Sequence, residues 1–339
     1  MMTPRARVIR ALTFAGPDRA PRDLWRLPGV GLFRQGELDA MLARYPIDFA
    51  QAEYRYGAAL RVSGTPERAG SYTDEWGCVW NVMEDGVVGE VKAHPLADWE
   101  ALGRYAAPWE VLEGADFSRT DACCAATDRF VRGSTCVRLF ERMQFLRGVE
   151  NLFVDFACEP EAVLALRDLV HAYYLREIEL WTQTAVDAIF FMDDWGSQHN
   201  LLISPAQWRA IFKPCYAEYC ARIKASGKFV FFHSDGYIEP ILEDLIEIGV
   251  DAINLQLFCM DIEGIAARYR GRITFWGEIC RQHVLPFGSV GAVRQAVRRV
   301  RRALDDGRGG VIAQCEWGNA DPAENIAAVF ETWLEPRGR

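Results

Sequence analysis

The sequence KFVFFHSDGYIEP, residues 228–240, changes abruptly from an apolar, strand-like run to a histidine and an aspartate. His233 and Asp235 are two residues apart, so their side chains point to the same side of an extended strand. Zinc in proteins takes imidazole nitrogen, thiolate sulfur and carboxylate oxygen, and a catalytic zinc keeps one position open. The candidate metal ligands are therefore His233, Cys315 and one carboxylate from Asp235 or Glu278. A histidine at a strand end is also often a hydrogen-bonded rim residue.

Other carboxylates end or follow apolar runs in the same way, at Asp74, Asp193 and Asp194. Crowded carboxyl groups raise one another's pKa and can serve as general acids. Alternatively, such aspartates cap the following loop and pair with arginine. Neighbouring strand residues point to opposite sides, so only one of Asp193 and Asp194 needs to face a site. Asp74, Asp193 and Asp235 are the candidate catalytic acids.

Tryptophan–glycine pairs recur beside these positions, at 76–77, 195–196, 276–277 and 317–318. They are interpreted either as core packing followed by a sharp glycine turn, or as aromatic walls for a planar ligand. The second interpretation adds polar and aromatic residues at strand ends as substrate-binding candidates: Arg26, Glu75, Trp76, Asp194, Trp195, Gln198 and Gln256.

Eight strands are predicted to position these residues, at 23–27, 71–77, 135–140, 188–194, 228–234, 252–258, 273–278 and 310–316. Helical periodicity lies between them, at 160–183, 204–227, 238–249, 289–307 and 321–334. Strand–helix alternation indicates a parallel sheet, and eight such strands favour an α/β fold with a single (β/α)8 barrel. We expect an N-terminal helical extension over residues 1–20 and the barrel over 21–339. The active site of such a barrel lies at the C-terminal ends of its strands.

The charge balance restricts the partners. The 339 residues carry 38 Lys and Arg against 47 Asp and Glu, a net charge of −9. This acidic balance argues against a nucleic-acid partner, since phosphate contacts need a basic surface. Ten cysteines without a CxxC pair or a secretory signal indicate free thiols in the cytoplasm. No apolar run approaches the ~20 residues that a membrane span needs.

Several segments carry a family resemblance: YTDEWGCVW, HPLADWE, LRGVENLFVD, FFMDDWGSQHNLLISPAQW, FFHSDGYIEPILEDLIEIGVDAIN and IAQCEWGNADPAENI. Distributed from about residue 70 to 330, they resemble the uroporphyrinogen decarboxylase superfamily, including its cobalamin-dependent methyltransferase branch. The resemblance implies a (β/α)8 barrel with its site at the C-terminal mouth. It also implies a homodimer, because barrels of this superfamily often pair.

The methyltransferase branch carries zinc on a His-x-Cys pair and a later cysteine. His233 matches the histidine, Cys315 matches the later cysteine, and Asp235 stands where the first cysteine is expected. The resemblance implies a zinc-dependent methyltransferase that exchanges a methyl group between a small methoxylated or thiol substrate and a corrinoid protein. A third ligand from Asp235 or Glu278 would favour oxygen chemistry, because carboxylates are harder ligands than thiolates.

The resemblance also leaves open a metal-free decarboxylase of a tetrapyrrole or another carboxylated ligand. Arg26 and Asp74 would then be the main active-site residues, although the characteristic Arg-Gln-Ala-Gly-Arg run of those enzymes is absent. A third hypothesis, from a different class, is a barrel that binds a corrinoid or aromatic ligand without catalysis.

Overall fold

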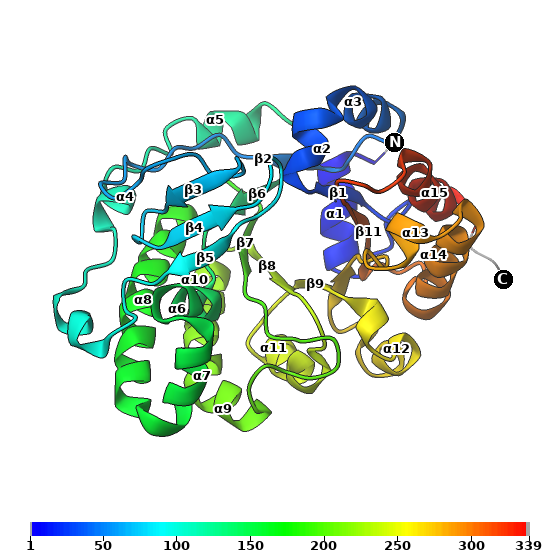
Figure 1. Cartoon of the computed structure of the whole chain (residues 1–339). Helices are drawn as coiled ribbons and strands as arrows, with labels where there is room; N and C mark the ends of the chain where they lie inside the picture. The colour runs from blue at the N-terminus through cyan, green and yellow to red at the C-terminus, as the bar shows by residue number, and fades with distance from the viewer. Residues whose placement is uncertain (1, 337–339) are drawn as a thin grey trace.

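Eight parallel strands form one sheet that curls into a nearly closed barrel with helices around it (Figure 1), which confirms the predicted fold class. The computed structural model describes residues 2–336. In sheet order the strands are β1 (Arg22–Arg26), β11 (Val311–Trp317), β10 (Thr274–Trp276), β9 (Ala252–Leu255), β8 (Phe229–Ser234), β7 (Ala188–Met192), β6 (Phe130–Ser134) and β2 (Phe49–Gln51).

Helices fill the connections and form the outer layer. They are α1 (Pro4–Leu12), α2 (Pro28–Phe33), α3 (Gln35–Arg44), α4 (Trp109–Glu113), α5 (Thr120–Ala125), α6 (Leu139–Arg147), α7 (Val149–Cys158), α8 (Pro160–Thr182), α9 (Pro205–Ile211), α10 (Lys213–Ala225), α11 (Leu242–Glu247), α12 (Ile262–Tyr269), α13 (Val284–Phe287), α14 (Val290–Leu304) and α15 (Ala323–Leu334), with 3-10 turns at Trp99–Arg104, Glu239–Ile241 and Leu257–Cys259. The helix predicted over 204–227 is divided into α9 and α10 at Phe212. Within the described residues, none of the helices has the length and apolarity to cross a membrane.

Two of the eight predicted barrel strands were wrong. Residues 70–73 form β3, which pairs antiparallel with β4 (Val79–Val82), and β4 pairs with β5 (Glu90–Ala93), in a separate sheet. The segment 135–140 follows β6 and runs into the start of α6. The barrel strands that take their places are β2, which has only three residues, and β6, whose apolar run is interrupted by Arg132 and Gly133.

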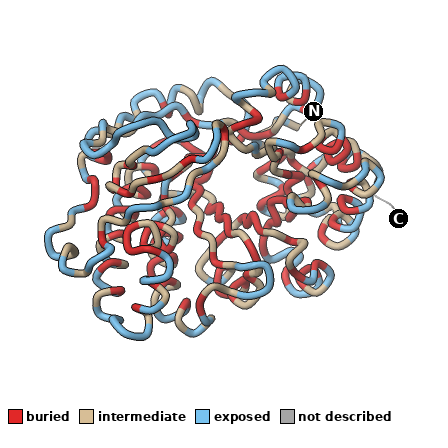
Figure 2. The backbone as a smooth tube through the Cα atoms, viewed as in Figure 1, coloured by how far each residue is buried: buried red, intermediate tan, exposed pale blue. Residues whose placement is uncertain are grey.

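Strand alternation separates two apolar clusters. Inward side chains, among them Phe49, Phe190, Phe231 and Trp276, fill the barrel interior, and outward ones pack beneath the helices. Figure 2 shows that the residues of the central strands are mostly buried and that many residues of the surrounding segments are exposed. Val8 and Leu12 of α1 join the interior cluster. Helix α1 therefore covers one end of the barrel, and the boundary at residue 20 stays a prediction.

Asp48 joins the two strands that end the sheet order, β1 and β2. Its backbone N–H donates to Arg22 O at 2.9 Å, and its carboxylate accepts the Arg22 backbone N–H at 2.6 Å. The same carboxylate accepts from the guanidinium groups of Arg7 at 2.6 Å and Arg19 at 2.7 Å. Asp48 is 1% exposed and Arg7 is 6% exposed, so this junction is a buried ion-pair network.

We expect Asp48→Ala to lower the free energy of unfolding by about 3–5 kcal/mol, because the Arg19 guanidinium and the Arg22 backbone N–H would lose their buried acceptor and Arg7 would keep only Asp18 as an ion-pair partner. Urea unfolding followed by circular dichroism measures this loss. Asp85→Ala is the control, since Asp85 pairs with the half-exposed Arg68 on the surface, and little change is expected there. Equal stability of the two variants would contradict a structural role for the Asp48 junction.

Candidate active site

His233 lies at the end of β8, inside the barrel, and Asn254 on the neighbouring strand β9 fixes its ring. His233 Nδ1 is 2.6 Å from Asn254 Oδ1. The Asn254 Nδ2 donates to the Trp276 carbonyl at 2.5 Å and to Gln314 Oε1 at 3.1 Å, so the amide oxygen must face the histidine. This network assigns the proton of a neutral His233 to Nδ1 and leaves the lone pair on Nε2.

Two carboxylates face the free nitrogen of His233. Nε2 lies 3.5 Å from Asp194 Oδ1 and 3.3 Å from Asp235 Oδ1. One ligand atom from each of the three residues lies within 4.8 Å of the others. Asp235 Oδ1 is sealed from solvent and has no hydrogen-bond partner within residues 2–336. An orphaned carboxylate oxygen beside an imidazole lone pair is a donor set that fits a divalent metal ion.

Arg281 holds the other side of Asp235. Its guanidinium pairs with Asp235 Oδ2, donates to Glu316 Oε1 at 2.8 Å, and lies 3.6 Å from Glu278. Burial raises the pKa of Glu278 well above its ordinary value, although Arg281 opposes this increase. Glu278 therefore lies beside Arg281 and outside the set of Asp194, His233 and Asp235. Of the two carboxylate oxygens of Asp235, Oδ2 is paired with Arg281 and Oδ1 is uncommitted.

The structure does not bring Cys315 to His233. On β11, Ile312 belongs to the interior cluster and Gln314 reaches Asn254, whereas Cys315 and Trp317 belong to the outer cluster under the helices. Cys315 is fully buried, and burial raises the pKa of its thiol. Of the four predicted metal ligands, His233 and Asp235 meet in the three-residue set, and Asp194, predicted to bind substrate, completes it. Glu278 lies beside Arg281 and outside that set, and Cys315 lies in the outer core.

Asp193, a predicted catalytic acid, points away from this set. Its carboxylate accepts the backbone N–H groups of Phe140 at 2.5 Å and Glu141 at 2.8 Å, in the first turn of α6, and the Tyr216 hydroxyl at 2.5 Å. Burial raises the pKa of Asp193 to about 7. Asp193 thus caps a helix. As expected from strand alternation, the neighbouring Asp194 points the other way, into the barrel mouth.

Asp74, also predicted to be catalytic, is committed to its own loop. It accepts the backbone N–H groups of Trp76 and Cys78 and the indole N–H of Trp80, and it pairs with Arg142 at 2.7 Å. Glu75 lies 3.5 Å from the same arginine. Asp74 therefore stabilises the loop after β3, at a position without an uncommitted oxygen for catalysis.

The remaining substrate-binding candidates are divided among several places. Glu75 and Trp76 line a separate cavity of about 540 Å³ with Glu177, whose pKa burial raises to about 7. Trp195 stacks on Phe140 in the outer core, with ring centroids 4.2 Å apart. Two glutamines lie near the mouth: Gln256 accepts the backbone N–H of Gly236, and Gln198 is exposed on the loop after β7.

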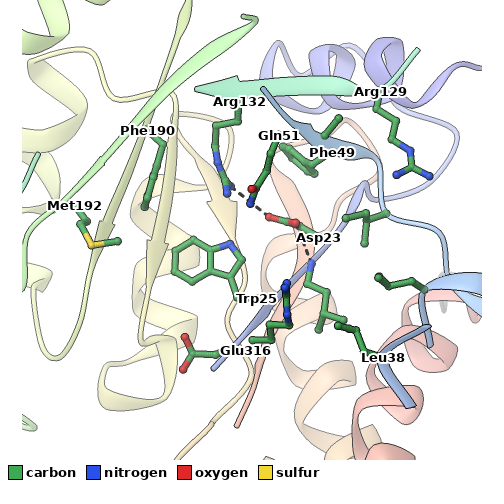
Figure 3. Close-up of a pocket in the computed structure, with 15 residues that line it drawn as sticks. Asp23, Trp25, Leu38, Phe49, Gln51, Arg129, Arg132, Phe190, Met192 and Glu316 are labelled. Carbon is green, nitrogen blue, oxygen red and sulfur yellow. Dashed lines mark hydrogen bonds and ion pairs between the residues drawn. The ribbon is translucent and has the colours of Figure 1, made fainter. Parts of the chain in front are cut away.

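A cavity of about 550 Å³ lies at the barrel mouth between β1 and β2 (Figure 3). It includes Arg26, the last of the predicted residues, together with Trp25 and Arg132, which the prediction missed. Asn254 and Arg281 were also missed. The inward position of Asn254 on β9 could have revealed it, whereas Arg281 follows β10 in a segment without strand periodicity.

Residues 141–335 match the family model described as Uroporphyrinogen decarboxylase (URO-D). The chain belongs to this family. No curated protein matches the sequence. Among solved structures, a methyltransferase from Methanosarcina mazei superposes with a TM-score of 0.73 at 14% identity, covering 98% of this chain and 98% of that chain. A glycosylated endo-β-1,4-xylanase from Gloeophyllum trabeum superposes with a TM-score of 0.46 at 12% identity, covering 98% and 99%.

The family match confirms the predicted resemblance, and the likeness to the Methanosarcina mazei methyltransferase shows a common barrel fold. Within the matched residues lie His233, Asp194, Asp235, Asn254 and Arg281, so the whole candidate metal set belongs to the URO-D segment.

We expect Asn254→Ala to weaken zinc binding about 10–100-fold, because the imidazole would lose the partner that fixes its tautomer and orientation. Competition of the purified protein with a chromophoric chelator measures the dissociation constant. His199→Ala is the matched control, because His199 is an exposed imidazole on the neighbouring mouth loop. Unchanged affinity in Asn254→Ala, or an equal loss in His199→Ala, would contradict the assignment.

Proposed function

We propose that this protein is a zinc-dependent methyltransferase that exchanges a methyl group between a small substrate and a corrinoid protein. The observation that carries the proposal is the uncommitted Asp235 Oδ1, 3.3 Å from the Nε2 of His233. Membership in the URO-D family and the fold likeness to a methyltransferase support it.

The residues of this chain have separate tasks in the proposal. His233, Asp194 and Asp235 would hold the zinc, Asn254 orients the imidazole, and Arg281 fixes the second oxygen of Asp235. Zinc, when bound, supplies a Lewis acid that polarises a heteroatom of the substrate. The substrate heteroatom keeps the bonding electron pair when the methyl group leaves, so the site must stabilise developing negative charge.

The donor set favours an oxygen heteroatom. Two carboxylates and one imidazole make a harder site than one containing thiolate, since thiolate ligands are soft and polarisable. We therefore infer that the substrate is a methyl ether in preference to a methylated thiol.

The metal-free decarboxylase alternative has less support. It relies on Asp74, whose oxygens accept three N–H groups and pair with Arg142. Arg26 does line the mouth cavity, but one arginine there does not single out a tetrapyrrole.

The test is methylation of cob(I)alamin by a panel of aryl methyl ethers, followed by absorbance, with the zinc-loaded protein. We expect turnover to fall about 100-fold or more in His233→Ala or after zinc removal, because the site loses its metal. Cys315→Ala should keep both zinc and turnover, because Cys315 packs in the outer core.

Three results would overturn the proposal. The first is full activity of the zinc-free protein. The second is no turnover of any ether by the zinc-loaded protein, and the third is release of CO2 when the protein is incubated with uroporphyrinogen.

A further inference from the structure

Arg132 is a buried arginine on β6 whose side chain lines the mouth cavity. The residue is 8% exposed. Its guanidinium makes one hydrogen bond within the described chain, from Nη1 to Asp23 Oδ2 at a long 3.4 Å, and Nε is buried without a partner. A guanidinium has five N–H donors, so most of the donors of Arg132 are uncommitted.

Asp23 does not satisfy Arg132, because its oxygens serve other groups. Oδ2 accepts the indole N–H of Trp276 at 3.0 Å, and Oδ1 accepts the backbone N–H of Leu24 at 2.9 Å. The remaining contacts of Arg132 are aromatic faces: Cζ lies 4.5 Å from the ring centroid of Trp276 and 5.0 Å from that of Phe190. These rings hold the cation in place and offer it no acceptor.

A second unpartnered donor lies beside this guanidinium. The indole Nε1 of Trp25 is buried and has no hydrogen-bond partner among residues 2–336. Figure 3 shows Trp25 below Arg132, with Gln51 close to the guanidinium and Asp23 on the far side. Three arginines line the cavity, Arg26, Arg129 and Arg132. Of the two acids there, Asp23 pairs with Arg132 at 3.4 Å and Glu316 pairs with Arg281. The cavity thus gathers N–H donors and positive charge around an apolar, aromatic floor.

We propose that Arg132 binds a carboxylate of the substrate, and that the substrates of this site are small aromatic carboxylates. A bidentate carboxylate satisfies the planar guanidinium fork. The cavity of about 550 Å³ has the size of a small-molecule site, and its aromatic walls suit a planar ring.

Trp25 connects the anion site with the candidate metal set. Its ring centroid lies 5.9 Å from Arg132 Cζ and 5.2 Å from the ring centroid of His233. A ring held by its carboxylate at Arg132 would lie against Trp25, the same indole that packs against His233. The identification of this anion as the methyl-bearing substrate rests on the proposed function, whereas the anion site itself does not.

The test compares benzoate with benzyl alcohol, its neutral counterpart, by titration calorimetry on the whole protein without corrinoid. We expect the wild type to bind benzoate about 10–100-fold more tightly than benzyl alcohol, because charge-assisted hydrogen bonds to one guanidinium contribute about that much affinity. The double variant Asp23→Asn/Arg132→Gln removes both buried charges together, so that neither is left unpaired, and should lose this preference. Arg132→Lys should retain part of it, because it keeps the charge and loses the fork.

Arg44→Gln is the control for net charge, since Arg44 is exposed on α3 outside this cavity; its benzoate affinity should match the wild type. Thermal unfolding checks that each variant is folded. The proposal is overturned if benzoate binds no better than benzyl alcohol, if the double variant keeps the preference while folded, or if Arg44→Gln loses it equally. Benzoate binding through Arg132 without demethylation of 4-methoxybenzoate would leave the anion site standing and count against the proposed function.

Discussion

The hydrogen bond between Asn254 and His233 is the constraint on which the candidate site depends. The two residues are paired in register on β8 and β9, so both side chains enter the barrel at the same level. Asn254 cannot turn its amide without losing its bonds to the Trp276 carbonyl and to Gln314. The fold therefore presents the His233 lone pair to Asp194 and Asp235, and the donor set is pre-organised by the scaffold.

Strand alternation divides chemically similar residues between two tasks. Asp194 faces the mouth, whereas the adjacent Asp193 turns outward and caps α6 through the backbone of Phe140 and Glu141. On β11, Gln314 faces inward and Cys315 packs outward under the helices. The outward residues attach helices to the barrel, and the inward residues form the mouth. The mouth then has two groups of opposite character, the candidate metal ligands around His233 and the guanidinium of Arg132, and Trp25 contacts both His233 and Arg132.

The sequence predicts the fold and the core of the site, but not how side chains distribute around the barrel. The long apolar runs after residue 180 reveal β7, β8 and β11, and the two-residue spacing of His233 and Asp235 predicts that they share a face. The family position of Cys315 does not reveal its orientation, which depends on the pairing of β11 with β1. Arg132 could not be predicted, because a charged residue within a short apolar run appears in the sequence to interrupt a strand. Only the fold shows that its side chain lies inside the barrel.

In the proposed site, zinc lies on His233, Asp194 and Asp235 without a sulfur ligand. X-ray absorption at the zinc edge of zinc-loaded protein tests this most directly. We expect only nitrogen and oxygen neighbours around the zinc, at about 2.0–2.2 Å. A sulfur neighbour at about 2.3 Å would contradict it, because a cysteine would then ligate the metal and the barrel mouth would be arranged differently.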